Sequence, residues 1–415
     1  MHRALTLTLS LCLLAALPAH AQSLESHADE HVQPVVRDSG VSLSQALALA
    51  VERAPGASLP QARLSTSRAL SERAGSVLSA PPAVQMRYQT DRVPGRPAGV
   101  RELEAGLELP LWRSGQRDAL RREAAAGQLL SEEELRIYRW RVAGELRETV
   151  WQVLQAETGV RLADVDVDLY RALEDDVSRR VKAGDAAPVE RLSAEAARRE
   201  RDSVLYEAQV ELAHSLFAWS TLTGLSVLPA SPDEKVADAP QGYPPVLVAQ
   251  AAVERARSAL GSVQAQGSGA PRLLVGVRSE KAPDSPSTDS VGATLSIPFG
   301  GEVHRAAEYS PLQLELARAE DDLAMSRRAA TLALHEAEHE LHAREQAQRM
   351  ARAQKEVADR EVDLARRAYR LGESSLAERL LTEARAANAR RMAALADIAY
   401  GRAVARYNNS LGILP

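Results

Sequence analysis

The chain repeats itself along almost its whole length, and this internal repeat constrains its fold more than any other feature. A shift of 188 positions places the segment 105–110 on 293–298, with a proline at the end of both. The same shift aligns four further pairs without a gap: Gly184 with Gly372, 190–192 with 378–380, 195–196 with 383–384, and 224–225 with 412–413. Because a fixed period indicates repeated structural units, the sequence predicts one unit present twice.

The domain boundaries follow from this repeat. We expect the first repeat at 41–228 and the second at 243–415. The linker between them, 229–242, is rich in proline, which is typical of a connection that continues neither helix nor strand. An N-terminal extension at 22–40 precedes the first repeat.

The first residues have the pattern of a secretory signal peptide. Arg3 precedes an apolar run, and Ala19 and Ala21 form a small-x-small cleavage site, so we expect residues 1–21 to be removed. Cys12 lies inside this segment and is the only cysteine of the chain. The secreted protein is therefore expected to have no disulfide, no thiol nucleophile and no thiolate metal ligand.

The composition favours long, closely packed helices over a globular enzyme core. Only 4% of the residues are aromatic, and Ala, Arg, Leu and Glu are abundant. The formal net charge is -5 with both signs interspersed, which gives no indication of nucleic-acid binding. No apolar stretch long enough for a membrane-spanning helix follows the signal peptide. No cofactor motif stands out, and we expect none.

Each repeat reads as a helix, two short extended segments, a very long helix, a glycine turn and a returning helix. The first helix covers about 43–79 in the first repeat, where Pro55 and Pro60 interrupt it. In the second repeat it is shorter, about 246–266. The class predicted is therefore mainly α with a small β part, built from a duplicated helix–β-hairpin–long helix–turn–helix unit.

The long helices are predicted at about 116–182 and 303–371, and each would be about 100 Å long. They and the returning helices carry apolar or small residues at seven-residue spacing, which is typical of coiled coils. Three such registers occur: Leu316, Leu323, Ala330 and Ala337; Met350, Val357, Leu364 and Leu371; and Leu380, Ala387, Ala394 and Gly401.

The short extended segments alternate between apolar and polar residues. In 101–110 the apolar positions are Leu103, Ala105, Leu107 and Leu109, and the segment 291–297 alternates in the same way. Each has a partner before it, at 84–89 and 273–278, which gives two β-hairpins. The intervening positions Glu102, Glu104 and Glu108 are expected to face the lumen of a barrel.

Four strands of this length are too few to close a barrel, since about eight give the smallest filled one. A sheet in lipid cannot leave an edge open, because each unpaired backbone group there costs several kcal/mol. Three copies of the chain would supply twelve strands, which predicts a homotrimer. The alternative is a soluble four-stranded cap on a periplasmic coiled-coil spacer protein.

The order of these features resembles the TolC-type outer-membrane factor family. The resemblance is carried by 41–55 at the first helix, 109–111 and 297–299 at the strand-to-helix junctions, and 369–374 at the second turn. It covers almost the whole mature chain, and the short length and non-lipidated start are similar to the CzcC-like heavy-metal efflux branch.

This resemblance implies a trimeric α-helical coiled-coil tunnel below a 12-stranded β-barrel. The protein would lie in the outer membrane, in contact with its lipid, with a long periplasmic portion. It would be the passive exit duct of a tripartite efflux system and not an enzyme. A periplasmic adaptor (membrane fusion) protein would link it to an inner-membrane resistance–nodulation–division pump, with divalent metal cations as one substrate class.

The resemblance also implies site residues near the two glycine turns. Glu190 and Glu378 lie where the family has acidic gate residues, and Glu195 and Glu383 are the next candidates along the returning helices. The other interpretation of these glutamates is a set of solvated surface charges. The adaptor-contact turns are at Gly184, Asp185, Leu371, Gly372 and Glu373, and the first turn departs from the family pattern by carrying Pro188.

The segment 335–339 matches the H-E-x-x-H pattern of zinc proteases, with Glu336 in the place of the general base. His335, His339 and His342 could form a zinc site of a periplasmic zinc metalloprotease, or a transient site for an exported divalent metal. The remaining interpretation is a solvated face of a long charged helix, on which the three histidines have no common role.

Overall fold

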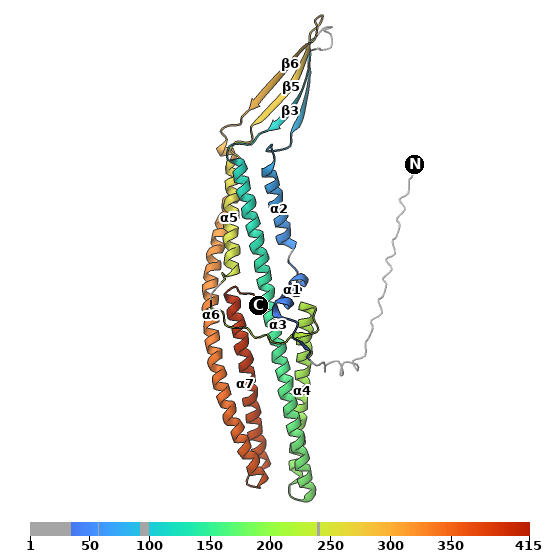
Figure 1. Ribbon diagram of the computed structural model, residues 1–415, viewed down its shortest axis with the longest axis vertical. Helices are drawn as coiled ribbons and strands as arrows, with labels where there is room; N and C mark the ends of the chain where they lie inside the picture. The colour runs from blue at the N-terminus through green and yellow to red at the C-terminus, as the bar shows by residue number, and fades with distance from the viewer. Residues whose placement is uncertain (1–34, 57, 92–98, 239–240) are drawn as a thin grey trace, which may run out of the picture.

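The protein is elongated, with a β-sheet at one end and two long helical hairpins that extend to the other (Figure 1). The computed structural model describes residues 35–56, 58–91, 99–238 and 241–415. The predicted signal peptide at 1–21 and most of the extension at 22–40 lie outside the described residues.

The two halves of the chain share one order of elements, except that the first half begins with two helices and the second with one. The first half contains α1 (Leu43–Arg53), α2 (Ser58–Gly75), β2 (Ala83–Thr90), β3 (Arg101–Pro110), α3 (Gln116–Ala183) and α4 (Pro188–Thr223). The second contains α5 (Pro244–Ala265), β5 (Arg272–Lys281), β6 (Thr288–Ser296), α6 (Glu302–Arg370) and α7 (Leu376–Ser410). A short parallel pair joins β1 (Arg37–Asp38) to β4 (Leu228–Pro229). The prediction of a mainly α fold with a small β part is confirmed.

Proline chemistry divides the first helix differently from the prediction. The helix α1 ends before Pro55, because the residue that precedes a proline disfavours helical dihedrals, and Ala54 is extended. Pro60 does not interrupt a helix. It lies in the first turn of α2, where its missing N–H needs no helical partner. The corresponding helix of the second half, α5, is continuous over 22 residues.

The long helices α3 and α6 contain 68 and 69 residues, so each is about 100 Å long. Glycine ends both. Gly184 has φ of 85° and donates its N–H to carbonyls of the last turn of α3. Gly372 follows the C-cap residue Leu371 of α6 and has φ of 77°. Each long helix then packs antiparallel against its returning helix, α3 against α4 and α6 against α7.

Small residues allow close packing between the two halves, as the heptad pattern predicts. A side chain on Gly401 of α7 would overlap the ring of Trp151 on α3. Trp151 is buried together with Leu146, Val150 and Trp219 in the main hydrophobic core. The core therefore lies along α3, where both halves of the chain meet.

A buried ionic network joins the linker to both halves. The guanidinium of Arg147 on α3 donates to both carboxylate oxygens of Glu234, at 2.8 and 2.6 Å. It also donates to the Asn409 side chain at 3.0 Å and to the carbonyl of Ile413 at 2.9 Å. Asn408 of α7 donates to the same Glu234 at 3.1 Å. Arg147 is 3% exposed, so this cluster, which we name the clasp, is shielded from solvent.

Candidate functional site

The four long strands form one antiparallel sheet in the order β2-β3-β5-β6. Directly paired residues point to the same face of a sheet. One such row is Met86, Ala105, Val277 and Val291. The sequence left open which way the strands near 84–89 and 273–278 face. The register answers this, because it places the large apolar residues of all four strands on one face, except Leu274, which pairs with Glu108 on the other.

This apolar face is open to solvent in the single chain. Val291 is 80% exposed and Met86 is 79% exposed. Seven further large apolar side chains on the face are exposed: Val84, Tyr88, Leu103, Leu107, Val275, Val277 and Leu295. An apolar surface of this extent marks a site of contact with another protein or with a membrane.

The opposite face of the sheet is polar and internally neutralised. Glu102 pairs with Arg278 at 2.5 Å, and Glu108 pairs with Arg272 at 3.3 Å. Glu104 lies 3.8 Å from both Arg278 and Arg87. The three glutamates predicted to face a lumen therefore share one face, each beside an arginine. Sequence reasoning missed these arginines, although Arg87, Arg272 and Arg278 all occupy polar positions of the alternation.

Three glycines form a row across the polar face. Gly106, Gly276 and Gly292 are directly paired on β3, β5 and β6. A Cβ atom on Gly276 would lie 2.6 Å from the carbonyl oxygen of Ala105 and 2.9 Å from the Cα of Gly106. Strands β3 and β5, which come from different halves of the chain, therefore approach each other closely where only glycine fits.

At the opposite end of the molecule, the two hairpin tips pack together. Tyr369 of α6 is buried against Leu173 and Val177 of α3. Two guanidinium groups contact its ring, that of Arg180 at 4.7 Å and that of Arg379 at 4.9 Å from the ring centroid. Burial raises the pKa of the Tyr369 phenol. From the sequence, Tyr369 was interpreted only as part of a turn motif, and this contact between hairpins was not predicted.

The glutamates Glu190 and Glu378 occupy equivalent positions with different surroundings. Ser375 and Glu378 form a reciprocal capping box at the start of α7, with a bond of 2.8 Å from the Ser375 N–H to the carboxylate. These bonds from the Ser375 backbone and hydroxyl lower the pKa of Glu378. In α4 the N-cap is Ala187, which has no side-chain acceptor, so Glu190 takes part in no capping box.

The second pair of predicted gate residues also differs. Glu195 is partly exposed and pairs with Arg199 one turn later, at 2.9 Å. Glu383 is 2% exposed and accepts two bonds from Arg366, at 2.6 and 2.9 Å. In this conformation Glu383 belongs to a buried ion pair between α6 and α7.

The predicted adaptor-contact turns are at the free end of the hairpins (Figure 1). Gly184, Asp185, Leu371, Gly372 and Glu373 are all exposed. The turns share one geometry: the N–H of Asp185 donates to Arg180 at 2.8 Å, and that of Glu373 donates to Ala368 at 2.9 Å. Pro188 does not distort the first turn, because it is the first residue of α4.

The histidines of the H-E-x-x-H segment lie on the exposed middle of α6. The rings of His335 and His339 are 4.3 Å apart between centroids. Within the described part of the chain, no three histidine, cysteine, aspartate or glutamate side chains are grouped to hold a metal ion. The metal site of His335, His339 and His342 therefore stays a prediction.

One predicted heptad register points away from its own hairpin. Met350, Val357, Leu364 and Leu371 are 59–72% exposed, and we name them the α6 stripe. The contact of α6 with the rest of the chain instead uses residues such as Val362 and Tyr369, which are buried. A second exposed set, the α4 stripe, consists of Val189, Leu192, Tyr206 and Phe217.

Among the described residues, no helix has a segment long and apolar enough to cross a membrane.

The comparisons with known proteins find this architecture among solved structures. No family model matches the sequence, and no curated protein matches it. The structure of CusC, described with transmembrane channel formation, superposes with a TM-score of 0.71 at 14% identity, over 89% of this chain and 92% of that chain. The CmeC outer membrane channel of Campylobacter jejuni superposes with a TM-score of 0.67 at 16% identity, over 89% of this chain and 85% of that chain. The outer membrane protein VceC of Vibrio cholerae superposes with a TM-score of 0.69 at 14% identity, over 89% of this chain and 96% of that chain.

The chain has the fold of outer-membrane channels. Each of these superpositions covers 89% of the chain, so the predicted TolC-type architecture is confirmed at the level of a single chain. In this fold the amphipathic sheet and the two hairpin tips are the candidate functional surfaces.

Proposed function

We propose that the protein is the outer-membrane channel of a tripartite efflux system. The observation that carries this proposal is the sheet, whose apolar face is exposed and whose polar face is lined by paired charges. A transmembrane barrel needs this division between lipid and lumen. The helical hairpins, about 100 Å long, then form a periplasmic tunnel through which substrate leaves passively.

The barrel closes by association of three chains. Within one chain, β2 and β6 are the outer strands of the sheet, and each has one edge without a partner strand in the described residues. In lipid these edges must pair, because unsatisfied backbone groups there are costly. When β2 of each chain pairs with β6 of the next, three copies give a ring of twelve strands.

The stripes on the helices support the same assembly. The spacing of seven residues along the α6 stripe, and of 14 and 11 along Leu192, Tyr206 and Phe217, keeps each set on one helix face. Both stripes are exposed in the single chain and run along the hairpins. Packing of the α6 stripe of one copy on the α4 stripe of the next would bury them in a coiled-coil seam.

The hairpin tips are the proposed contact with a periplasmic adaptor, which links the channel to an inner-membrane resistance–nodulation–division pump. The exposed turns around Gly184 and Gly372 have matching geometry and offer the adaptor two similar surfaces per chain. We assign divalent metal cations as the substrate class. The resemblance to the CzcC-like branch, the acidic residues near the tips and the His335–His339 pair support this assignment.

Location and assembly test this function directly. We expect the full-length chain to fractionate with outer membranes and, after detergent extraction, to sediment as a trimer.

Substitution of Leu364 by Glu in the α6 stripe should shift the detergent-extracted protein toward monomer, whereas Glu361→Gln, on the same helix but outside the stripe, should leave the trimer intact. A soluble periplasmic monomer would support the spacer interpretation. Casein cleavage that is lost in Glu336→Gln would support the protease.

The gate residues are best tested at Glu190. Six carboxylates from Glu190 and Glu378 would gather at the narrow end of a trimeric tunnel and favour cations over anions. Glu190→Gln should lower cation selectivity in planar-bilayer recordings and weaken block by divalent ions. Glu378→Gln is a poorer test, because it also removes a capping bond. The control is Glu207→Gln, an exposed position farther along α4. Unchanged selectivity in Glu190→Gln would show that this carboxylate is a surface charge.

A further inference from the structure

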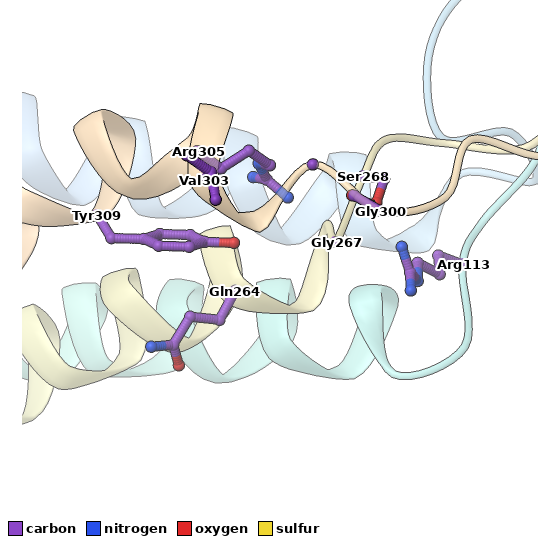
Figure 2. Close-up of a pocket in the computed structure, with 9 residues that line it drawn as sticks. Arg113, Gln264, Gly267, Ser268, Gly300, Val303, Arg305 and Tyr309 are labelled. Carbon is purple, nitrogen blue, oxygen red and sulfur yellow. The ribbon is translucent and has the colours of Figure 1, made fainter.

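A cavity of about 620 Å³ lies where the sheet joins the helices, at the start of α3, the end of α5 and the start of α6 (Figure 2). Its polar lining comes from Arg113, Gln264, Ser268, Arg305 and Tyr309. Figure 2 shows the Tyr309 side chain with its hydroxyl end directed toward the end of α6 that also carries Arg305. None of these residues belongs to the surfaces described above.

One of the two arginines keeps an unused hydrogen-bond donor beside this cavity, and the other has no ion pair among the described residues. Arg305 uses Nε for Glu308, at 2.9 Å, and Nη2 for the carbonyl of Val263, at 3.0 Å. Its Nη1 is buried and has no partner in the described structure. A buried hydrogen-bond donor without an acceptor is rare, which favours a ligand that supplies the acceptor. No ion pair of Arg113 occurs among the described residues, and its guanidinium lies directly against the Cα of Gly267.

The backbone adds donors to the same place. The helix α6 begins after Gly301, which has no side chain to cap it, and Gly300 and Gly301 both have positive φ, 73° and 82°. The first N–H groups of a helix have no intrahelical acceptor, and the helix dipole favours an anion beside them. Two guanidinium groups and the start of a 69-residue helix therefore surround one cavity.

We propose that this cavity binds the phosphate group of an organic phosphate. Arginine forms paired hydrogen bonds with phosphate oxygens, and helix N-termini bind phosphate through backbone N–H groups. The volume exceeds what inorganic phosphate fills, so the ligand carries further atoms beyond the phosphate. A phospholipid headgroup and a free phosphate ester share this chemistry.

The surroundings of the cavity favour a lipid as the source. Phe299, 94% exposed, lies three residues before the first residue of α6, and Val303, 87% exposed, is the second residue of this helix. Phe299 and the exposed Ile297 continue the odd-numbered apolar positions of β6. Exposed aromatic and apolar residues at the end of membrane strands lie at headgroup level. The phosphate site itself needs no channel function, whereas the lipid as its source rests on the proposed function.

The experiment measures binding of soluble short-chain probes to the full-length detergent-purified protein by isothermal titration calorimetry. The probes are dihexanoyl phosphatidic acid, dihexanoyl glycerol, which lacks the phosphate, glycerol 3-phosphate and inorganic phosphate. We expect dihexanoyl phosphatidic acid to bind and dihexanoyl glycerol not to bind. Arg113→Gln and Arg305→Gln should each weaken binding at least tenfold. Arg121→Gln should not, because Arg121 is exposed on α3 and pairs with Asp118 outside the cavity.

The outcomes separate the two sources and the two proposals. Binding of the lipid alone assigns the site to headgroups, and equal binding of glycerol 3-phosphate assigns it to free phosphate esters. Binding of no phosphate ester, or equal affinity in Arg113→Gln, overturns the proposal. Arg113 lies before the start of α3 and has no ion pair among the described residues, so Arg113→Gln remains decisive if Arg305→Gln fails to fold. Membrane fractionation is scored separately, so a soluble protein that still binds phosphate refutes only the channel function.

Discussion

Substitution of Leu295 by arginine should lower the yield of stable barrel. Leu295 lies on the apolar face at the next-to-last position of β6, paired with Leu273, and is 55% exposed in the single chain. If this face contacts lipid, an arginine costs about 2–4 kcal/mol per chain at the bilayer midplane and less toward the strand end, where Leu295 lies. In the proposed trimer the cost acts on every chain. The measurement is urea unfolding in lipid vesicles, followed by tryptophan fluorescence, together with the yield of trimer in outer membranes.

The matched control is arginine at Thr294, the adjacent residue on the polar face. Thr294 is paired with Leu274 and faces the side that carries the glutamates of β3. We expect Thr294→Arg to assemble almost as well as the parent chain. Gly106 is not a suitable control, because any side chain there would crowd Leu274, with a Cβ only 2.9 Å from its Cδ1 atom. Equal loss of assembly at 294 and 295 would show that the sheet does not lie in a membrane.

Removal of the Arg147 side chain should give the second large effect, on the helical body. Arg147→Ala leaves the Glu234 carboxylate buried without its partner, and loss of one member of a buried ion pair costs about 3–5 kcal/mol. The expected result is a lower free energy of unfolding for the helices, measured by circular dichroism in detergent with increasing urea. Arg171→Ala on the same helix, where the pair with Asp168 is exposed, should cost less than about 1 kcal/mol.

A double variant separates the charge from the fold of the linker. Arg147→Met with Glu234→Leu removes both charges and keeps apolar volume, so it should recover much of the loss seen in Arg147→Ala. A double variant as unstable as Arg147→Ala would show that the hydrogen bonds to Asn409 and Ile413, and not the ion pair, hold the clasp.

The repeat and the alternation of 101–110 were enough to predict the element order, because both depend on local periodicity. The register of the sheet was not predictable in the same way. The strands Ala83–Thr90 and Arg272–Lys281 show their faces only once Met86 is paired with Ala105 and Ala105 with Val277. Pairing is a property of the folded sheet, so its consequences for Glu102 and Arg278 follow only from the structure.

The glutamates at the tips show a second limit. An offset of 188 residues makes Glu190 and Glu378 equivalent, but the residues three positions earlier are Ala187 and Ser375. The sequence S-x-x-E at 375–378 is a capping-box pattern, so this cap could be predicted from the sequence. The burial of Tyr369 was not, because it arises where two hairpins from different halves meet. The buried ion pair of Glu383 arises where α6 and α7 pack together, which also requires the folded hairpin.

In the proposed trimer, the outer edges of β2 and β6 have a genetic consequence. A ring closed by β2 of one chain on β6 of the next uses a different surface on each side of every joint, so one defective edge opens the whole ring. In a cell that makes equal amounts of parent and edge-defective chains, random mixing would leave only about one trimer in eight without a defective chain. Edge variants should therefore act as dominant negatives, whereas variants that fail before assembly should be recessive.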